Sequence, residues 1–314
     1  MPFEGTPYFS SQKSHCEHGS TRPHQKKTTY FHQVVTPVIA APNQSQVIPL
    51  APEFIPPQDG HQKPDCELNA SKRGLQQWGD RLSALRVTLL GDDLDSPQPF
   101  CEVLLAQRMD FLLVCKPDSH VTVSEWVDYL DKIGEVKTLV KKRWTGKSYE
   151  TDTYRYVQPI PLRDDDDALK VNWCELTTRQ DDGTIVYRNA FITSHQLNDK
   201  SVIEAVRAGR TRWKIENENN NVLKTKGYHF DHNFGHGQHH LAALLATLII
   251  LAFLIHTLLE LMDEDFKLLR QQLPSRQRLF NDLLALTTYL YFDSWSALLT
   301  FMLQGRVSRH PVPT

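Results

Sequence analysis

The chain has 314 residues, of which 40% are hydrophobic and 23% are charged, and this composition is typical of a folded globular protein. The formal net charge of −2 excludes a global attraction to nucleic acid, so any contact with DNA or RNA must come from local basic patches. The five scattered cysteines, an odd number, exclude a disulfide framework and favour a reducing cytoplasm.

The N-terminal part of the chain predicts strands separated by polar loops. Residues 1–11 are extended, and residues 28–40 are rich in β-branched and aromatic side chains, which favours a strand. Residues 46–55 predict another strand, which its prolines place near a sheet edge. The basic loop 14–27 holds Cys16 with loosely spaced histidines. This is a weak zinc pattern, and we interpret the loop as disordered or facing nucleic acid.

Helices and buried strands alternate in the next part of the chain. Pro64 suits the first turn of a helix that runs to about residue 78, and Ser96-Pro97 opens a second helix. Residues 86–91 and 111–116 are short apolar segments that predict buried strands. This alternation predicts a mixed α/β sheet.

Two acids, Asp92 and Asp93, directly follow the predicted strand 86–91. The carboxyl end of a buried strand ahead of a helix is where α/β folds place functional groups, so these acids are candidate metal ligands. The alternative is that their charges simply stabilise the N-terminus of the next helix.

A basic and mostly β region follows. Residues 136–149 carry Lys141, Lys142 and Arg143 around two aromatic side chains, with no acid among them. This pattern suits a surface that grips a nucleic-acid backbone, and an exposed basic hairpin fits it equally well. The consecutive aspartates 164–167 predict a solvated turn rather than a metal cluster. Three antiparallel strands are predicted at residues 153–162, 169–178 and 184–193.

The segment 207–240 organises the C-terminal half of the chain. Residues 211–226 predict one helix, because they contain no proline or glycine and Gly227 follows at the position of a C-cap glycine. Arg212 and Glu216 are four residues apart and would share one face of this helix. The pattern fits either an ion pair on a solvated face or a metal-binding carboxylate on a helix whose basic residues bind phosphates.

Residues 241–262 are almost entirely apolar. Their apolar run covers about fifteen residues with only Thr247 inside it, which is shorter than a typical membrane span. We therefore predict a fully buried core helix and no membrane partner. Further helices are predicted at residues 264–273, from the Pro274-Ser275 break to about residue 290, and at 294–303.

Two sequence blocks resemble bacterial insertion-sequence transposases of the aspartate–aspartate–glutamate class. They are LLGDD with SPQPF after it, and RWKIENENNNVLKTKGYHFDHNFGHG. In the family's glutamate motif, Arg212 and Glu216 match, whereas Gly209 occupies the tyrosine position and Lys224 comes one residue later than the family's lysine. The resemblance covers nearly the whole chain and implies an α/β, ribonuclease-H-like core.

The resemblance implies a metal site formed by three acids. Asp92, with Asp93 as the alternative, would be the second aspartate, Glu216 the glutamate, and Glu4 replaces the first aspartate in an acid-Gly-Thr motif. The implied cofactor is Mg²⁺, or Mn²⁺ in its place, and the implied activity is cleavage of transposon-end DNA with strand transfer. The residues expected to neutralise DNA phosphates are Arg210, Arg212, Lys214, Lys224, Lys226, Lys141, Lys142 and Arg143.

The resemblance also divides the chain into functional parts. The parts are the first portion of the core (1–120), a mostly β insertion (121–197), the glutamate helix with the apolar helix (198–262) and C-terminal helices (263–314). The implied partners are double-stranded DNA and, on DNA, a second copy of the chain, in a bacterial cytoplasm. The family's N-terminal helical DNA-binding domain is not in this sequence, so we expect a truncated enzyme with weak transposition.

Two other classes of function stay open. One is a catalytically inactive DNA-binding remnant of a transposase, which the glutamate at position 4 favours. The other is a metal-binding or membrane protein built on the apolar helix and the histidines before it, His229, His232, His236, His239 and His240.

Overall fold

The computed structural model describes residues 1–14, 16, 19–24, 27–56, 67–93, 97–237 and 239–307. The chain forms two compact units, each described by itself. Unit 1 consists of Met1–Phe3, Ala40–Gln44 and Cys66–Lys214, and unit 2 consists of Glu4–Ile39, Ser45–Asp65 and Ile215–Thr314. The functional parts expected from the sequence cut across these units, and that division stays a prediction.

Unit 1 is built on a six-stranded mixed sheet with the strand order β7-β8-β12-β11-β10-β9. The strands are β7 (Thr88–Gly91), β8 (Asp110–Val114), β9 (Lys137–Trp144), β10 (Tyr149–Pro161), β11 (Lys170–Gln180) and β12 (Ile185–Thr193). β7 and β8 are parallel, and the other neighbouring pairs are antiparallel. Pro2 forms a parallel bridge with Leu90, so Met1–Phe3 lies beside β7. The mixed α/β class expected from the sequence is therefore confirmed.

The strands expected to form a β insertion belong to this same sheet. β12 pairs with β8, where Phe191, Ile192 and Thr193 face Val114, Leu113 and Leu112. The strand positions expected from the sequence are confirmed to within a few residues at their ends. The pairing of β12 with β8 was not predicted, because it joins residues far apart in the chain.

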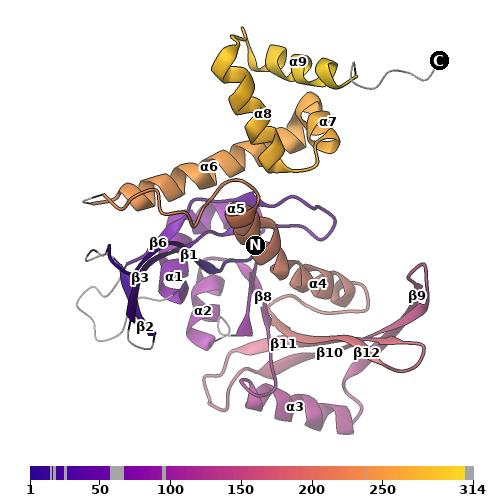
Figure 1. Cartoon of the computed structure of the whole chain (residues 1–314). Helices are drawn as coiled ribbons and strands as arrows, with labels where there is room; N and C mark the ends of the chain where they lie inside the picture. The colour runs from indigo at the N-terminus through magenta and orange to yellow at the C-terminus, as the bar shows by residue number, and fades with distance from the viewer. Residues whose placement is uncertain are drawn as a thin grey trace, which may run out of the picture. The chain divides into compact units, whose positions relative to one another are not determined.

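Helices cover both faces of the sheet of unit 1. They are α1 (Glu67–Ala84), α2 (Gln98–Ala106), α3 (Val121–Lys132) and α4 (Ser201–Arg210). Side chains alternate along a strand, so Tyr154 and Tyr156 pack with Val202 and Val206 of α4 in one apolar cluster. α3 lies on the opposite face (Figure 1). Pro97 precedes α2 as expected, whereas Pro64 and Ser96 lie outside the described residues.

Unit 2 begins with a separate antiparallel sheet. It contains β1 (Gly5–Ser11), β3 (Lys27–Val35) and β2 (Ser20–His24) in that order, with β6 (Glu53–Ile55) paired to β3. β4 (Val38–Ile39) and β5 (Ile48–Pro49) form a small second ladder. The expectation of one sheet running through the first half of the chain is therefore wrong: among the described residues, β1 and β3 are not in the sheet of β7 and β8.

The predicted helix 211–226 is helical but is not one α-helix. It consists of a 3₁₀ turn (Thr211–Trp213), a π-helical segment (Ile215–Asn220) and α5 (Asn221–Thr225). Within the π-helical segment, Asn219 Nδ2 donates a hydrogen bond to Asn220 Oδ1 at 2.9 Å. The turns of this stretch are tighter or wider than α-helical turns, so the shared face of Arg212 and Glu216 stays a prediction.

The end of unit 2 is helical. It contains α6 (Leu241–Met262), α7 (Glu264–Gln272), α8 (Arg276–Tyr289) and α9 (Trp295–Val307). Asp263 accepts a hydrogen bond from the Phe266 N–H, and Ser275 accepts one from the Arg278 N–H, so local caps fix where α7 and α8 begin. The last three predicted helices are confirmed.

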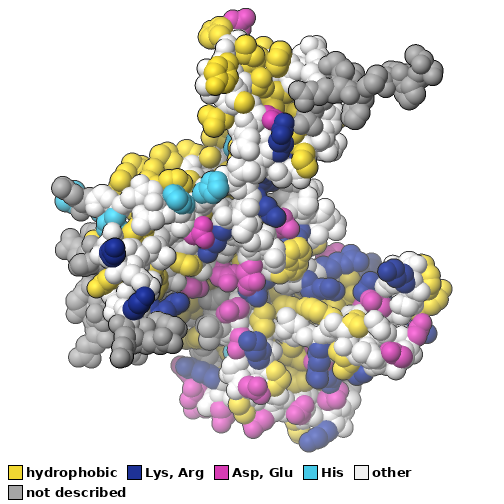
Figure 2. Space-filling view, viewed as in Figure 1, with side chains coloured by type: hydrophobic (Ala, Val, Ile, Leu, Met, Phe, Trp, Pro, Cys, Tyr) yellow, Lys and Arg dark blue, Asp and Glu magenta, His cyan; other side chains and the backbone are white. Residues whose placement is uncertain are grey.

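The prediction of a fully buried helix at residues 241–262 is wrong. Only a narrow stripe of α6 is buried, consisting of Ala246, Ile250, Phe253 and Thr257. Leucines such as Leu244 are exposed, and Figure 2 shows hydrophobic side chains along this helix. Among the described residues, α6 alone has a length and composition that would suit a membrane span. Core helices of soluble proteins meet the same criterion, so this is weak evidence for a membrane.

Candidate functional site

The two acids after β7 have different environments. The Asp93 carboxylate accepts hydrogen bonds from the Lys116 backbone N–H at 2.9 Å and from the Ser119 hydroxyl, and it lies 3.4 Å from Nε2 of His120. Burial lowers the pKa of His120, and the charge of Asp93 counteracts that effect. Asp93 therefore holds the loop between β8 and α3. Asp92 and Asp93 are both half-buried, and both stay candidate metal ligands.

The other two candidate acids, Glu4 and Glu216, belong to unit 2. Glu216 is exposed on the π-helical segment, whereas Glu4 is half-buried directly before β1. Partial burial lowers the pKa of the Lys224 ammonium, and the negative charges of Asp231 and Glu4 counteract this effect. Glu4 and Lys224 therefore lie within electrostatic range of each other. Asp92 belongs to unit 1, so the convergence of the three acids stays a prediction.

A cavity of about 560 Å³ opens beside Lys224 in unit 2. Arg22 and Asp231 contribute its charged lining, together with the rings of Phe9 and Phe31. The Arg22 guanidinium lies over the Phe31 ring, 5.1 Å from its centroid. Arg22 and Lys224 supply positive charge to this cavity, and Asp231 supplies negative charge. Arg22 lies in β2 and Lys224 in α5, so no spacing in the sequence connects them.

Lys214 is not a DNA-binding residue in this structure. Its side chain is buried, and its ammonium donates hydrogen bonds to the carbonyl oxygens of Ala41, at 2.7 Å, and Gln44. An ammonium held in this way cannot reach a phosphate in solution. The sequence pattern could not reveal this, because residues 41–44 lie far from Lys214 in the chain.

Several cations of unit 1 gather on the α4 face of the sheet, among them the predicted DNA-binding residues Arg210, Lys141 and Arg143. Arg207 and Arg210 are exposed, and the Arg210 guanidinium lies over the Tyr187 ring, 4.4 Å from its centroid. Burial raises the pKa of the Tyr154 hydroxyl, and the charge of Asp152 raises it further. The positive charges of Arg207, Arg143 and Arg210 counteract this effect. Figure 2 shows Lys and Arg side chains gathered over α4 and the β9–β10 hairpin.

The cations of β9 differ in how much of their charge is balanced. Arg143 forms ion pairs with Glu150 and, at 3.0 Å, with Asp152. Lys141 faces Asp152 across the ladder, which places it on the same side of the sheet as Arg143. Lys142 is exposed on the opposite side, facing Thr151. Residues 136–149 contain no acid, and the partner strand β10 supplies the two acids that pair with Arg143.

Gly209 packs closely against the sheet of unit 1. A Cβ atom at this position would lie 2.6 Å from the Phe191 ring, so α4 packs on β12 through the bare backbone of Gly209. Any larger side chain would push the helix away from the sheet.

The sequence analysis missed a second cavity, of about 400 Å³, between α3 and the sheet of unit 1. Its lining includes His120, Arg155, Trp173 and Glu175. Glu175 is buried and pairs with Arg155 at 3.4 Å and with Arg188 at 2.8 Å. Arg155, Glu175 and Arg188 lie on three different strands, so no spacing in the sequence could have indicated the cavity.

No model of a known protein family matches this chain, and no curated protein is significantly similar to it. The functional assignment therefore depends on the motif residues and on their surroundings in the structure.

Proposed function

We propose that this protein is a DNA transposase of the aspartate–aspartate–glutamate class with a ribonuclease-H-like core. It cleaves transposon-end DNA and transfers strands with the help of Mg²⁺ or Mn²⁺. The observation that supports this proposal best is Glu216, an exposed carboxylate on a π-helical segment that directly follows a stretch rich in arginine. Single π-helical turns inside helices are rare and are found at functional sites more often than elsewhere.

The acids suit a hard divalent cation. Asp92, Glu216 and Glu4 offer carboxylate oxygens, which are the donors that Mg²⁺ prefers. When bound, such cations stabilise the attacking and leaving oxygens of a phosphodiester exchange. We assign this role to Asp92, which directly follows β7, with Asp93 as the alternative.

The basic residues are assigned to the DNA backbone. Arg207 and Arg210 are exposed on the α4 face, and Lys141 faces the same side from the edge strand β9. Each exposed cation that meets a phosphate releases a counterion, which strengthens binding at low salt. Arg212 of unit 1 is half-exposed and Lys226 of unit 2 is exposed, so both can also reach phosphates. The net charge of −2 makes this local clustering necessary.

The test is nicking of duplex DNA that carries the ends of the encoding element, with Mg²⁺ or Mn²⁺ present. Glu216→Ala should abolish cleavage, whereas the matched control Glu218→Ala, a change two residues along the same π-helical segment, should retain most of it. Equal cleavage by wild type and Glu216→Ala would remove the support for the assignment.

A second candidate function is a DNA-binding protein without catalysis. The observation that favours it is Glu4, which is longer than the aspartate of the family and has Lys224 nearby as a counter-charge. This candidate predicts salt-dependent DNA binding that survives Glu216→Ala, with no cleavage by the wild type under either metal. Cleavage by the wild type that depends on Glu216 would exclude it.

A further inference from the structure

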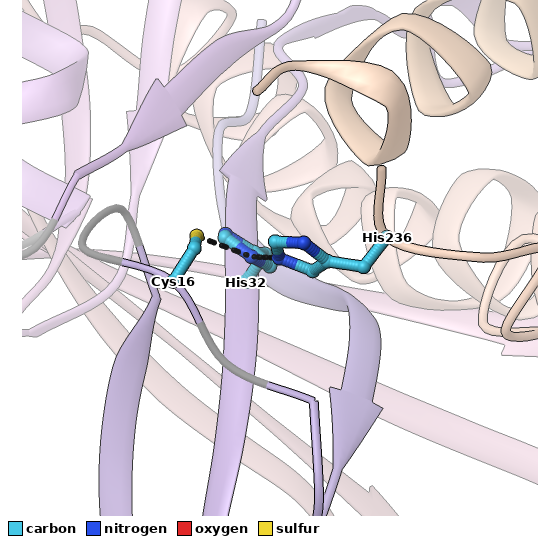
Figure 3. Close-up of side chains that lie close together, drawn as sticks. All are labelled: Cys16, His32 and His236. Carbon is cyan, nitrogen blue, oxygen red and sulfur yellow. Dashed lines mark hydrogen bonds between the residues drawn. The ribbon is translucent and has the colours of Figure 1, made fainter. Parts of the chain in front are cut away.

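Three potential metal ligands from separate segments of unit 2 meet at one point (Figure 3). Cys16 lies between β1 and β2, His32 lies in β3, and His236 lies in the loop between α5 and α6. Cys16 Sγ is 3.6 Å from His32 Nε2, and His32 Nε2 is 2.9 Å from His236 Nε2. All three ligand atoms lie within 4.8 Å of one another. We infer that these residues form a zinc site that pins the loop after α5 to the β1-β3-β2 sheet.

The distances suit tetrahedral zinc. With bonds of about 2.3 Å to sulfur and 2.0–2.1 Å to nitrogen, tetrahedral geometry separates sulfur from nitrogen by roughly 3.6 Å and two nitrogens by roughly 3.3 Å. The sulfur–nitrogen distance already has this value, and the two ring nitrogens need to separate by only a few tenths of an ångström. A thiolate with two imidazoles is a donor set that selects zinc over Mg²⁺, which prefers oxygen.

Neighbouring groups orient the ligands. His236 Nδ1 lies 3.0 Å from the Gly237 carbonyl oxygen, which can only accept a hydrogen bond, so the proton resides on Nδ1. His236 Nε2 is then unprotonated and can coordinate a metal. A backbone carbonyl that fixes the tautomer of a ligating histidine is the usual outer support of a zinc site.

Aromatic rings pack around the two histidines of the site. His32 is buried, its ring stacks on Tyr8 at 5.8 Å between centroids, and Phe9 contacts both histidine rings. Cys16 is the one cysteine among the described residues that is not buried, so it can exchange a proton for a metal. With three ligands from the protein, the fourth position of zinc is left to water.

The experiment measures zinc in the purified full chain by elemental analysis. We expect about one zinc per chain, and loss of any one ligand should weaken zinc affinity at least about 100-fold. Cys16→Ser and His236→Asn should therefore be purified without zinc. His239→Asn, a matched change at an exposed histidine three residues from His236, should keep it. Glu216→Ala should also keep it, which separates this site from the proposed catalytic acids.

Cobalt(II) provides a second measurement that does not depend on a variant folding. The wild-type chain reconstituted with Co²⁺ should show thiolate-to-cobalt charge-transfer absorption, and the Cys16→Ser chain should not. Removing the metal with a chelator should lower the melting temperature of the wild type but not that of His236→Asn. A wild-type chain that binds neither Zn²⁺ nor Co²⁺, or equal binding by Cys16→Ser, His236→Asn and His239→Asn, would overturn the inference.

Discussion

Replacing Lys214 with methionine should destabilise unit 1 without changing how the protein binds DNA. The substitution keeps an unbranched side chain one atom shorter and removes both hydrogen bonds of the ammonium, to the carbonyls of Ala41 and Gln44. A hydrogen bond to a charged group contributes about 1.5–3 kcal/mol. Gln44 is exposed, so water can replace the ammonium at its carbonyl, and the net loss should be on the order of 2–3 kcal/mol.

Thermal unfolding monitored by circular dichroism measures this effect. For a unit of this size, the loss corresponds to a fall of roughly 4–12 °C in melting temperature. Lys226→Met, a matched change at an exposed lysine, should leave the melting temperature unchanged. The reasoning would be refuted by a Lys214→Met protein that melts like the wild type and binds DNA with a smaller dependence on salt, because such a lysine would contact phosphate.

Three further predictions concern single side chains. Arg210→Ala should reduce the slope of log DNA affinity against log salt concentration by about 0.9. Arg143→Ala should reduce the slope less, because Glu150 and Asp152 already balance the charge of Arg143. Equal slopes for the two variants would contradict the assigned surface. Gly209→Ala should lower the unfolding free energy by about 1–3 kcal/mol through contact with Phe191, while Gly305→Ala, with open space around it, should not. Burial, with the charges of Arg276 and Arg270, lowers the pKa of His256 from 6.5 to about 4. As the pH falls, His256 is therefore protonated in the unfolded chain at a higher pH than in the folded chain. The free energy of unfolding should be highest above pH 6.5 and should fall by roughly 2 kcal/mol as the pH drops towards 4. His256→Gln should flatten that dependence in urea titrations.

Helix caps and turn residues could be recognised in the sequence, because they act on neighbouring residues of the chain. The helices α7 and α8 begin where side chains of Asp263 and Ser275 cap them, and both residues could be recognised in the sequence. The turn between β11 and β12 contains Gly183 with a φ of 86°, which is the left-handed conformation that the Asp-Asp-Gly pattern indicated. The exposed aspartates 164–167 also form the solvated turn that was expected.

Contacts between distant residues account for the expectations that were wrong. The stripe of α6 that is buried depends on which elements pack against it, and its uniform composition contains no such information. Similarly, the division of the strands into two sheets depends on pairings such as β8 with β12. The cluster of Cys16, His32 and His236 joins residues up to 220 positions apart, so it has no spacing motif.

The hydrogen bonds of Asp93 affect how mutations at the two neighbouring acids must be interpreted. An alanine at position 93 would leave the Lys116 amide and the Ser119 hydroxyl without their acceptor and release the start of α3. An alanine scan scored by turnover alone would then rank Asp93 beside Asp92, although only one of them is assigned to the cation. A melting curve recorded for each variant distinguishes a lost metal ligand from a released loop. The alanine variant at position 93 should melt at a lower temperature, because it loses the hydrogen bonds that hold the loop before α3.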